Sequence, residues 1–413
     1  MKLKISKCEK VFGCISISGS KNVALPVIAS SLLSKKTVIL KNIPLITDVL
    51  LMLEIIKTMG VFVKREKDKV KIKAKNFNPI INSKDVSKFR GSYYLIGACL
   101  ARYNMCSIRM PGGCSFTDRP IDLHLKAFKK LGYVVSKHKE TIVIKKEKKT
   151  CTEIVFEKKS LGATINTIVA SSLINRQITI QNISQEPEVL ETISFLKKLG
   201  ISISLIDNKV IINGIKKNKT ISFKIISDRI EAGSYMLLAS AVPNSELRVR
   251  NAPIQYMANV IEVLQDIGCN ILKNKKELIV KSANLKAINL EVNEYPSFPT
   301  DLQQILSVVL LKAKGKSQIK DNVYPDRLTH VKELRKMKAK ILDTPDGVNI
   351  RPSNLVGSNV EAKDLRCCFA LIVAGSIACK DTIISNAEIL LRGYEKPLLK
   401  LKSIGIKVNE YIY

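Results

Sequence analysis

A pattern that recurs about every 70 residues constrains the fold of this chain more than any other feature. Each repeat begins with a small-residue helical segment, such as KNVALPVIASSLL, followed by a β-branched strand and a turn. A second helix then ends at an apolar residue plus Gly, and two alternating strands close the repeat. Six such repeats in 413 residues suit two domains of about 200 residues each. The pattern therefore predicts two α/β domains of three repeats each.

Two kinds of position mark the repeats, and both favour a left-handed backbone, which Asn and Gly tolerate best. The turn after the first strand falls at Asn42, Gly112, Asn182, Asn251, Asn322 and Asn386. The second helix ends at Gly60, Gly132, Gly200, Gly268, Lys338 and Gly405. Because Lys338 replaces Gly, we expect that helix to end differently.

The second repeat departs most from the pattern, since its turn is the segment PGGCSFTDRP at residues 111–120. Cys114 follows two glycines and lies five residues before Arg119. A nearby guanidinium favours the reactive thiolate form of a cysteine. Cys114 is therefore a candidate reactive residue, although a structural role remains the alternative. The cysteines in apolar segments, which we expect to be buried, are Cys99, Cys106, Cys367, Cys368 and Cys379.

Polar candidates also occur where helices are expected to begin. Lys21 and Asn22 follow Ser20, and Ser160–Thr164 repeats the arrangement in the third repeat, with Lys158 and Lys159 just before it. The free N–H groups and positive potential of a helix start suit phosphate or carboxylate. Asp301, in FPTDLQQ, is by itself better explained as an acidic residue that stabilises a first helical turn.

The formal net charge of +32 would, alone, indicate a nucleic acid or another polyanion as partner. The lysines, however, are spread over the whole chain, and aromatic residues make up only 5% of it. We interpret most of the charge as a lysine-rich composition, with a share left for phosphorylated substrates. Arginine is scarcer, and six arginines lie at repeat boundaries: Arg90, Arg119, Arg229, Arg327, Arg366 and Arg392.

Membrane, secretory and metal-binding functions have little support in the sequence. The longest apolar stretch, Phe369–Cys379, is too short to span a bilayer and predicts a core helix. The first residues, MKLKISKCEK, lack the apolar region of a signal peptide, and the ten cysteines form no CxxC pair. We therefore expect a cytoplasmic protein with reduced thiols, no metal and no cofactor.

Several segments together carry a resemblance to a known family: SGSKNVALP, FRGSYYLIG, PGGCSFTDRPIDLH, KKSLGATIN, SDRIEAGSY, FPTDLQQ, DRLTHVKEL, DLR and RGYE. Over its full length the chain resembles the UDP-N-acetylglucosamine 1-carboxyvinyltransferases. The resemblance implies a two-domain inside-out α/β barrel with six βαβαββ repeats, three per domain. It also implies that residues 1–20 join 228–413 in one domain, and that 21–227 form the other, which carries the Cys114 loop. The active site would lie in the cleft between them.

The resemblance further implies the reaction. The enolpyruvyl group of phosphoenolpyruvate moves to the 3′-hydroxyl of UDP-N-acetylglucosamine by addition and elimination, with release of phosphate. This is the first committed step of peptidoglycan synthesis. Cys114 matches the family's proton donor, which can form a covalent adduct and is the target of fosfomycin, and Asp301 matches the group that accepts the hydroxyl proton. Lys21 and Arg392 match further catalytic positions.

Binding residues follow from the same resemblance. Those implied for phosphoenolpyruvate are Lys21, Asn22, Arg119 and Arg392. Those implied for the sugar nucleotide are Arg90, Arg119, Pro120, Ile121, Asp122, Leu123, Lys158, Lys159, Ser160, Leu161, Asp301 and Val323. Arg327 and Arg366 would support them. The chain departs from the family at Leu391, where Asp is usual, and at Lys338 and Cys367–Cys368. None of these changes removes a reacting group, so we expect an active enzyme.

Two alternatives remain open at this point. The shikimate-pathway enolpyruvyl transferase shares the fold and the donor, but it lacks the cysteine loop. A basic repeat protein that binds nucleic acid would explain the charge. It would not explain the segments in which Cys114, Arg119 and Asp301 lie.

Overall fold

The computed structural model describes residues 1–110, 121–215, 219–274 and 277–411. Within these ranges the chain forms two compact units. Unit 1 contains residues 1–18 and 227–411, and unit 2 contains residues 19–110 and 121–226.

Unit 2 contains three open four-stranded sheets in its described part. In spatial order their strands are β14 (Ile221–Lys224), β3 (Thr37–Lys41), β5 (Lys69–Lys73) and β4 (Phe62–Glu66); β6 (Ile80–Ile81), β7 (Met105–Arg109), β9 (Thr141–Lys146) and β8 (Tyr133–His138); and β10 (Glu153–Val155), β11 (Ile178–Gln181), β13 (Lys209–Ile215) and β12 (Ile201–Ile206). The helices are α1 (Lys21–Ser31), α2 (Thr47–Thr58), η1 (Lys84–Lys88), η2 (Arg90–Tyr93), α3 (Tyr94–Tyr103), α4 (Asp122–Lys130), α5 (Leu161–Ser171) and α6 (Pro187–Leu199).

Unit 1 has the same construction. Its sheets are β16 (Asn270–Lys273), β17 (Glu277–Lys281), β15 (Glu246–Arg250) and β2 (Phe12–Ser16); β18 (Asn289–Val292), β19 (Ser317–Asp321), β21 (Gly347–Ile350) and β20 (Ile341–Thr344); and β22 (Asn359–Glu361), β23 (Thr382–Ser385), β1 (Leu3–Ser6) and β24 (Lys407–Glu410). Its helices are α7 (Arg229–Ala241), η3 (Ile254–Tyr256), α8 (Ala258–Asp266), α9 (Thr300–Leu310), α10 (Thr329–Lys336), α11 (Leu365–Ile377), η4 (Ala387–Arg392) and α12 (Pro397–Ser403).

The first strands of the chain complete two sheets of unit 1. β1 lies antiparallel between β23 and β24, with Leu3 opposite both Ile384 and Glu410. β2 pairs in parallel with β15, far along the chain. The N-terminal segment thus supplies the strands that the fourth and sixth repeats lack.

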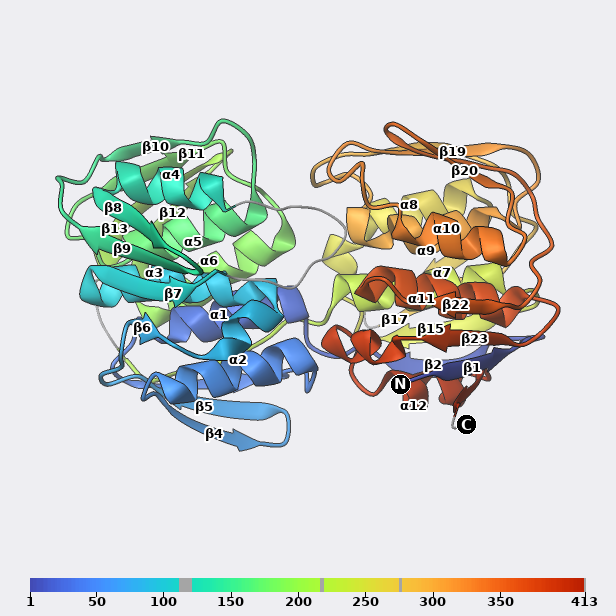
Figure 1. Ribbon diagram of the computed structural model, residues 1–413, viewed down its shortest axis with the longest axis horizontal. Coiled ribbons are helices and arrows are strands. Elements are labelled where there is room, and N and C mark those ends of the chain that lie inside the picture. Colours follow the sequence, from blue (N-terminus) through green and yellow to red (C-terminus); the bar gives the residue numbers. More distant parts are fainter. Residues whose placement is uncertain (111–120, 216–218, 275–276, 412–413) are drawn as a thin grey trace. The chain divides into compact units, whose positions relative to one another are not determined.

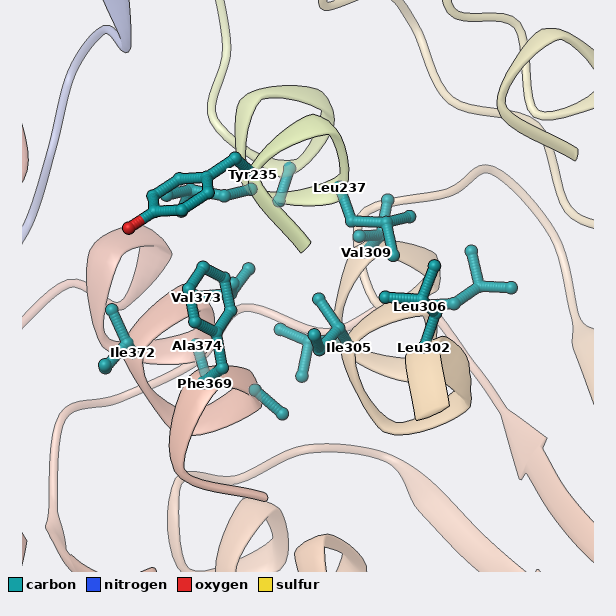
Figure 2. Packing of buried hydrophobic residues seen from close by; sticks show 14 of the residues in the cluster. Tyr235, Leu237, Leu302, Ile305, Leu306, Val309, Phe369, Ile372, Val373 and Ala374 are labelled. Atoms are coloured by element: carbon teal, nitrogen blue, oxygen red, sulfur yellow. The ribbon is translucent and has the colours of Figure 1, made fainter. Parts of the chain in front are cut away.

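The first helix of each repeat forms the centre of its unit, with the sheets around it (Figure 1). Helices α7, α9 and α11 are apolar on nearly every face and pack on one another, as α1, α3 and α5 do in unit 2. Figure 2 shows this core in unit 1, where Tyr235, Ile305 and Phe369 come from three different helices. The predicted α/β repeat architecture is confirmed, and the apolar stretch that begins at Phe369 lies mainly in α11.

Most of the predicted turn residues are left-handed. Asn42, Asn182, Asn251 and Asn386 have φ angles between 54° and 59°, whereas Gly112 lies outside the described residues. The prediction is wrong for Asn322, whose φ is not positive. There the Asp321 carboxylate oxygen Oδ1 accepts hydrogen bonds from the N–H groups of Val323 (3.0 Å) and Tyr324 (2.8 Å). This side chain stabilises the turn without a left-handed residue.

Two further expectations were wrong. Lys338 has φ of 66°, so its helix ends with a left-handed residue as the Gly-ended helices do. This conformation costs about 1–2 kcal/mol for a residue with a Cβ, and it accompanies a helix-end bond in which the N–H of Ala339 donates to the carbonyl of Leu334 (3.1 Å). Cys379 is exposed, because α11 ends at Ile377 and the chain leaves the core there. Among the helices described, none is long and apolar enough to cross a membrane.

Candidate active site

The candidate residues of unit 2 lie where its helices begin. Lys21 and Asn22 form the first turn of α1, and the Ser20 hydroxyl caps this helix by accepting from the N–H of Val23 (3.4 Å). The Lys21 ammonium lies 3.5 Å from the carboxylate of Asp48, in the first turn of α2, and its side chain is only 15% exposed. The ion pair fixes the direction of the lysine side chain, and little water solvates its ammonium group. Such a lysine suits an anionic ligand.

Three other helix starts of unit 2 converge. A Cβ added to Gly162, in the first turn of α5, would lie 2.5 Å from the Tyr93 hydroxyl and 3.1 Å from the His124 ring. Only glycine therefore allows α3, α4 and α5 to begin so close together. The contact brings together Arg90, the segment Ile121, Asp122 and Leu123, and the segment Lys158, Lys159, Ser160 and Leu161. Ser160 caps α5 through the N–H of Ala163 (3.4 Å).

A buried neutral network supports these helix starts. The Asn166 side-chain oxygen accepts from the N–H of Gly97 (2.8 Å), and its amide nitrogen donates to the Tyr93 carbonyl (2.9 Å) and to His124 Nδ1 (3.2 Å). Burial, and secondarily the charge of Arg90, lowers the pKa of His124 to about 3. His124 is thus neutral near pH 7, and the cations here are the lysines and Arg90, a set typical of a phosphate site.

Three predicted residues of unit 2, Cys114, Arg119 and Pro120, lie outside the described residues. Their roles remain predictions from the sequence.

In unit 1 the structure joins Asp301 to two arginines. Arg327 Nη1 lies 2.6 Å from Asp301 Oδ1, and Arg366 Nη2 lies 2.8 Å from Asp301 Oδ2. The arginine side chains are 6% and 8% exposed, while the carboxylate retains 24% exposure. Burial alone raises the pKa of Asp301, but the charges and hydrogen bonds of Arg366 and Arg327 outweigh it and hold this pKa well below its usual range. We call these three residues the aspartate–arginine cluster.

The cluster shows that Asp301 does more than stabilise a helix start. It is ionised at neutral pH and is still partly accessible, so it can accept a proton from a bound hydroxyl. Both of its oxygens already accept from a guanidinium, which makes it a weak base. The arginines therefore determine both the position and the basicity of this carboxylate.

Two acidic residues that sequence reasoning missed fix the elements around the cluster. Asp364 caps α11 by accepting from the N–H groups of Arg366 (2.8 Å) and Cys367 (3.0 Å), and its other oxygen accepts from Gln304 and Thr329. Asp321 accepts from the Thr300 hydroxyl (2.6 Å), next to Asp301. An Asp directly before a helix is a recognisable cap signal, so Asp364 could have been found from the segment DLR.

The remaining candidates of unit 1 are Val323, which follows β19, and Arg392, which ends η4. The N–H of Val323 is bound by Asp321, and its side chain is partly buried. Arg392 ends η4 and is partly buried, whereas Leu391 beside it is 39% exposed. In the described part of the chain, no group of three His, Cys, Asp or Glu residues could hold a metal ion.

The fold is that of an enolpyruvyl transferase, and the chain belongs to the EPSP synthase (3-phosphoshikimate 1-carboxyvinyltransferase) family, which matches residues 5–401. Full-length curated relatives have a more particular name. The UDP-N-acetylglucosamine 1-carboxyvinyltransferase of Clostridium botulinum is 35% identical, over 98% of this chain and 99% of its own. The protein of that name from Wolbachia pipientis wMel is 36% identical, over 97% of both chains.

Solved structures confirm the predicted fold. The enolpyruvyl transferase NikO from Streptomyces tendae superposes with a TM-score of 0.90 at 18% identity, covering 99% of this chain and 98% of its own. An EPSP synthase from Acinetobacter baumannii gives 0.78 at 17% identity, covering 99% and 100%. At such identities the likeness concerns the fold alone.

His330, in α10 beside this site, predicts how stability depends on pH. Its ring is fully buried, neither nitrogen has a hydrogen-bond partner among the described residues, and burial lowers its pKa to about 4 although Asp364 opposes this. As the pH falls below about 6.5, the unfolded chain binds a proton that the folded one does not, so the free energy of unfolding decreases by about 1.4 kcal/mol per pH unit. This stability is present above pH 6.5 and is lost toward pH 4.

The substitution His330→Leu removes this titration. We therefore expect the free energy of unfolding of His330→Leu, relative to that of the original protein, to be about 2 kcal/mol more favourable at pH 5 than at pH 7.5. Urea unfolding at both pH values measures this change. Buried Glu231, whose pKa burial raises to about 7, has the opposite pH dependence, but it is common to both proteins. The exposed His138 in β8 provides the control substitution, His138→Leu. An equal difference at the two pH values would contradict the prediction.

Proposed function

We propose that this protein transfers the enolpyruvyl group of phosphoenolpyruvate to the 3′-hydroxyl of UDP-N-acetylglucosamine, the first committed step of peptidoglycan synthesis. The observation that carries the choice of acceptor is the 35–36% identity, over nearly the whole chain, to relatives named for this reaction. The ionised, partly accessible Asp301 supports the chemistry, because the acceptor hydroxyl must lose a proton.

The proposed reaction has two stages. A proton from Cys114 adds to the methylene carbon of phosphoenolpyruvate, and the sugar oxygen bonds to the neighbouring carbon while Asp301 takes the hydroxyl proton. The Cys114 thiolate then takes back a proton from the methyl group, phosphate leaves, and the double bond is restored. Lys21, Asn22, Arg119 and Arg392 bind the donor, and the cations among them stabilise the charge that develops on the departing phosphate.

The sugar nucleotide has proposed contacts in both units. The cations Arg90, Lys158 and Lys159 suit its diphosphate, and Asp301 and Val323 lie in the other unit. We place the active site in a cleft formed by the two units and the protein in the cytoplasm, with these two small molecules as its partners. No metal and no nucleic acid takes part in the proposed reaction.

Comparison of acceptors tests the proposal. With phosphoenolpyruvate as donor, UDP-N-acetylglucosamine should give a product whose mass is larger by one enolpyruvyl group, and 3-phosphoshikimate should give none. A higher kcat/KM with 3-phosphoshikimate would instead assign the protein to the reaction for which the family is named.

Because the proposed contacts to the sugar nucleotide come from both units, we predict that the units close around it. A ligand shifts such an equilibrium only if it binds the closed form more tightly, and contacts in both units provide that preference. Small-angle scattering should show a smaller radius of gyration at saturating UDP-N-acetylglucosamine. Uridine, which lacks the diphosphate and the sugar, is the control ligand. An unchanged radius, with saturation verified by calorimetry, would exclude closure driven by the sugar nucleotide.

A further inference from the structure

A chain of hydrogen bonds leads from the core of unit 1 to the aspartate–arginine cluster. Arg366 Nη1 lies 3.1 Å from the Tyr394 hydroxyl, and that hydroxyl lies 2.7 Å from the Ser234 hydroxyl. Ser234 also lies 2.7 Å from the carbonyl of Ile230, one turn earlier in α7. Tyr394 is 1% exposed, Ser234 is fully buried and the Arg366 side chain is 8% exposed, so water does not compete for these bonds.

The direction of each bond follows from counting hydrogens. Ser234 has one hydroxyl hydrogen, which it donates to the Ile230 carbonyl, so its oxygen can only accept from Tyr394. Tyr394 therefore donates to Ser234, and its oxygen accepts from Arg366. Arg366 in turn donates to Asp301 Oδ2 through its other terminal nitrogen. Burial, although opposed by Arg366, raises the pKa of Tyr394 to about 12, so the donor hydrogen stays in place at neutral pH.

The Tyr394 ring is fixed by packing. It stacks on Phe369 of α11 with a centroid distance of 4.7 Å and an angle of 24°. The Arg366 guanidinium carbon lies 5.5 Å from the centroid of the Tyr394 ring. Phe369 and Arg366 are one helical turn apart on the same helix, so the tyrosine contacts this helix at both places.

We propose that Tyr394 is a positioning residue, which orients the Arg366 guanidinium so that the Asp301 carboxylate meets the acceptor hydroxyl in a fixed geometry. This inference deepens the proposed function and rests on it. Tyr394 does not touch the reacting atoms and acts through Arg366. Arg327 also binds Asp301, but its guanidinium carbon lies 5.0 Å from the ring of a different tyrosine, Tyr324, so its position should depend on Tyr394 far less.

The chain offers a closely matched control. Tyr235, in α7, is also fully buried and packs edge-on against the same Phe369, at 5.3 Å and 84°. Its hydroxyl has no hydrogen-bond partner among the described residues. Tyr394→Phe and Tyr235→Phe thus remove the same atom from the same core, but only the first removes a contact with Arg366.

Steady-state kinetics with both substrates is the first test. Tyr394→Phe should lower kcat roughly tenfold, the effect of losing one hydrogen bond to a charged group, with KM for UDP-N-acetylglucosamine changed less than about twofold. Ser234→Ala should give a smaller loss of the same kind, and Tyr235→Phe should leave both constants near those of the original enzyme. Equal kcat values in the two Tyr→Phe variants of an active enzyme would overturn the inference.

Arginine side-chain NMR is the second test and does not depend on turnover. The Arg366 signal, assigned with Arg366→Lys, should show faster rotation of the guanidinium group in Tyr394→Phe but not in Tyr235→Phe. Arg327 provides the internal reference. Unchanged rotation of Arg366 would overturn the positioning role even if turnover falls. An original enzyme without activity toward UDP-N-acetylglucosamine would instead contradict the proposed function, and the rotation rates would still decide the role of Tyr394.

Discussion

Asp301→Asn should lower kcat by about 10²–10⁴-fold, the usual effect of removing a general base. The amide cannot take up the hydroxyl proton, and it replaces a carboxylate that two arginines hold in place. Because the base acts in the transition state, kcat and kcat/KM should fall together. Affinity for UDP-N-acetylglucosamine, measured by calorimetry, should change far less than turnover.

The matched control is Asp343→Asn, which also removes a carboxylate paired with an arginine, Arg335, but both of these side chains are exposed to solvent. It should leave turnover unchanged. Thermal unfolding of both variants is needed, since Asp301→Asn leaves two buried guanidinium groups without their counter-charge. A folded Asp301→Asn variant with normal turnover would show that Asp301 only stabilises the start of α9.

Cys114→Ser should lower kcat by a similar factor of about 10²–10⁴, since the hydroxyl is a far weaker acid than the thiol. An epoxide analogue of phosphoenolpyruvate should label the original enzyme mainly at Cys114 and should label the variant very little. Peptide mapping by mass spectrometry measures both results. The glycine-rich segment and the neighbouring Arg119 motivate this expectation.

The structure identifies the cysteines that could compete for the label. Cys99 and Cys367 are fully buried, and burial raises the pKa of Cys367 to about 12. The described cysteines that are exposed are Cys14, Cys151 and Cys379. Cys151→Ser is therefore the matched control, and it should keep both labelling and turnover. Dominant labelling at any of these cysteines would contradict the assignment of Cys114.

Much of the fold could be predicted because its determinants are local. A helix that is apolar on all faces, such as α11, must be buried, and the recurring Gly after a helix predicts a left-handed end. The two errors at turns show that residue type alone does not determine the backbone conformation. At Asn322 the side chain of the preceding Asp321 stabilises the turn without a positive φ, and at Lys338 a residue other than glycine is left-handed.

The candidate site could be predicted only in part, because its contacts join distant segments. Sequence patterns placed Asp301 at a helix start, but its arginine partners lie 26 and 65 residues further along the chain. The repeat pattern and the hydrophobic pattern of the sequence give no information on such pairings. The bond between Ser234 and Tyr394 spans 160 residues, so Tyr394 was visible only as part of the motif RGYE.

Phosphate release from phosphoenolpyruvate, followed with and without UDP-N-acetylglucosamine, decides whether the proposed transfer takes place. With both substrates we expect continuous release, with one enolpyruvylated sugar nucleotide formed per phosphate. Without the sugar nucleotide we expect no release, because addition of the Cys114 thiol across the double bond leaves the phosphate on the adduct. Sustained release that does not depend on UDP-N-acetylglucosamine, or no release in its presence, would mean that the protein does not catalyse this transfer.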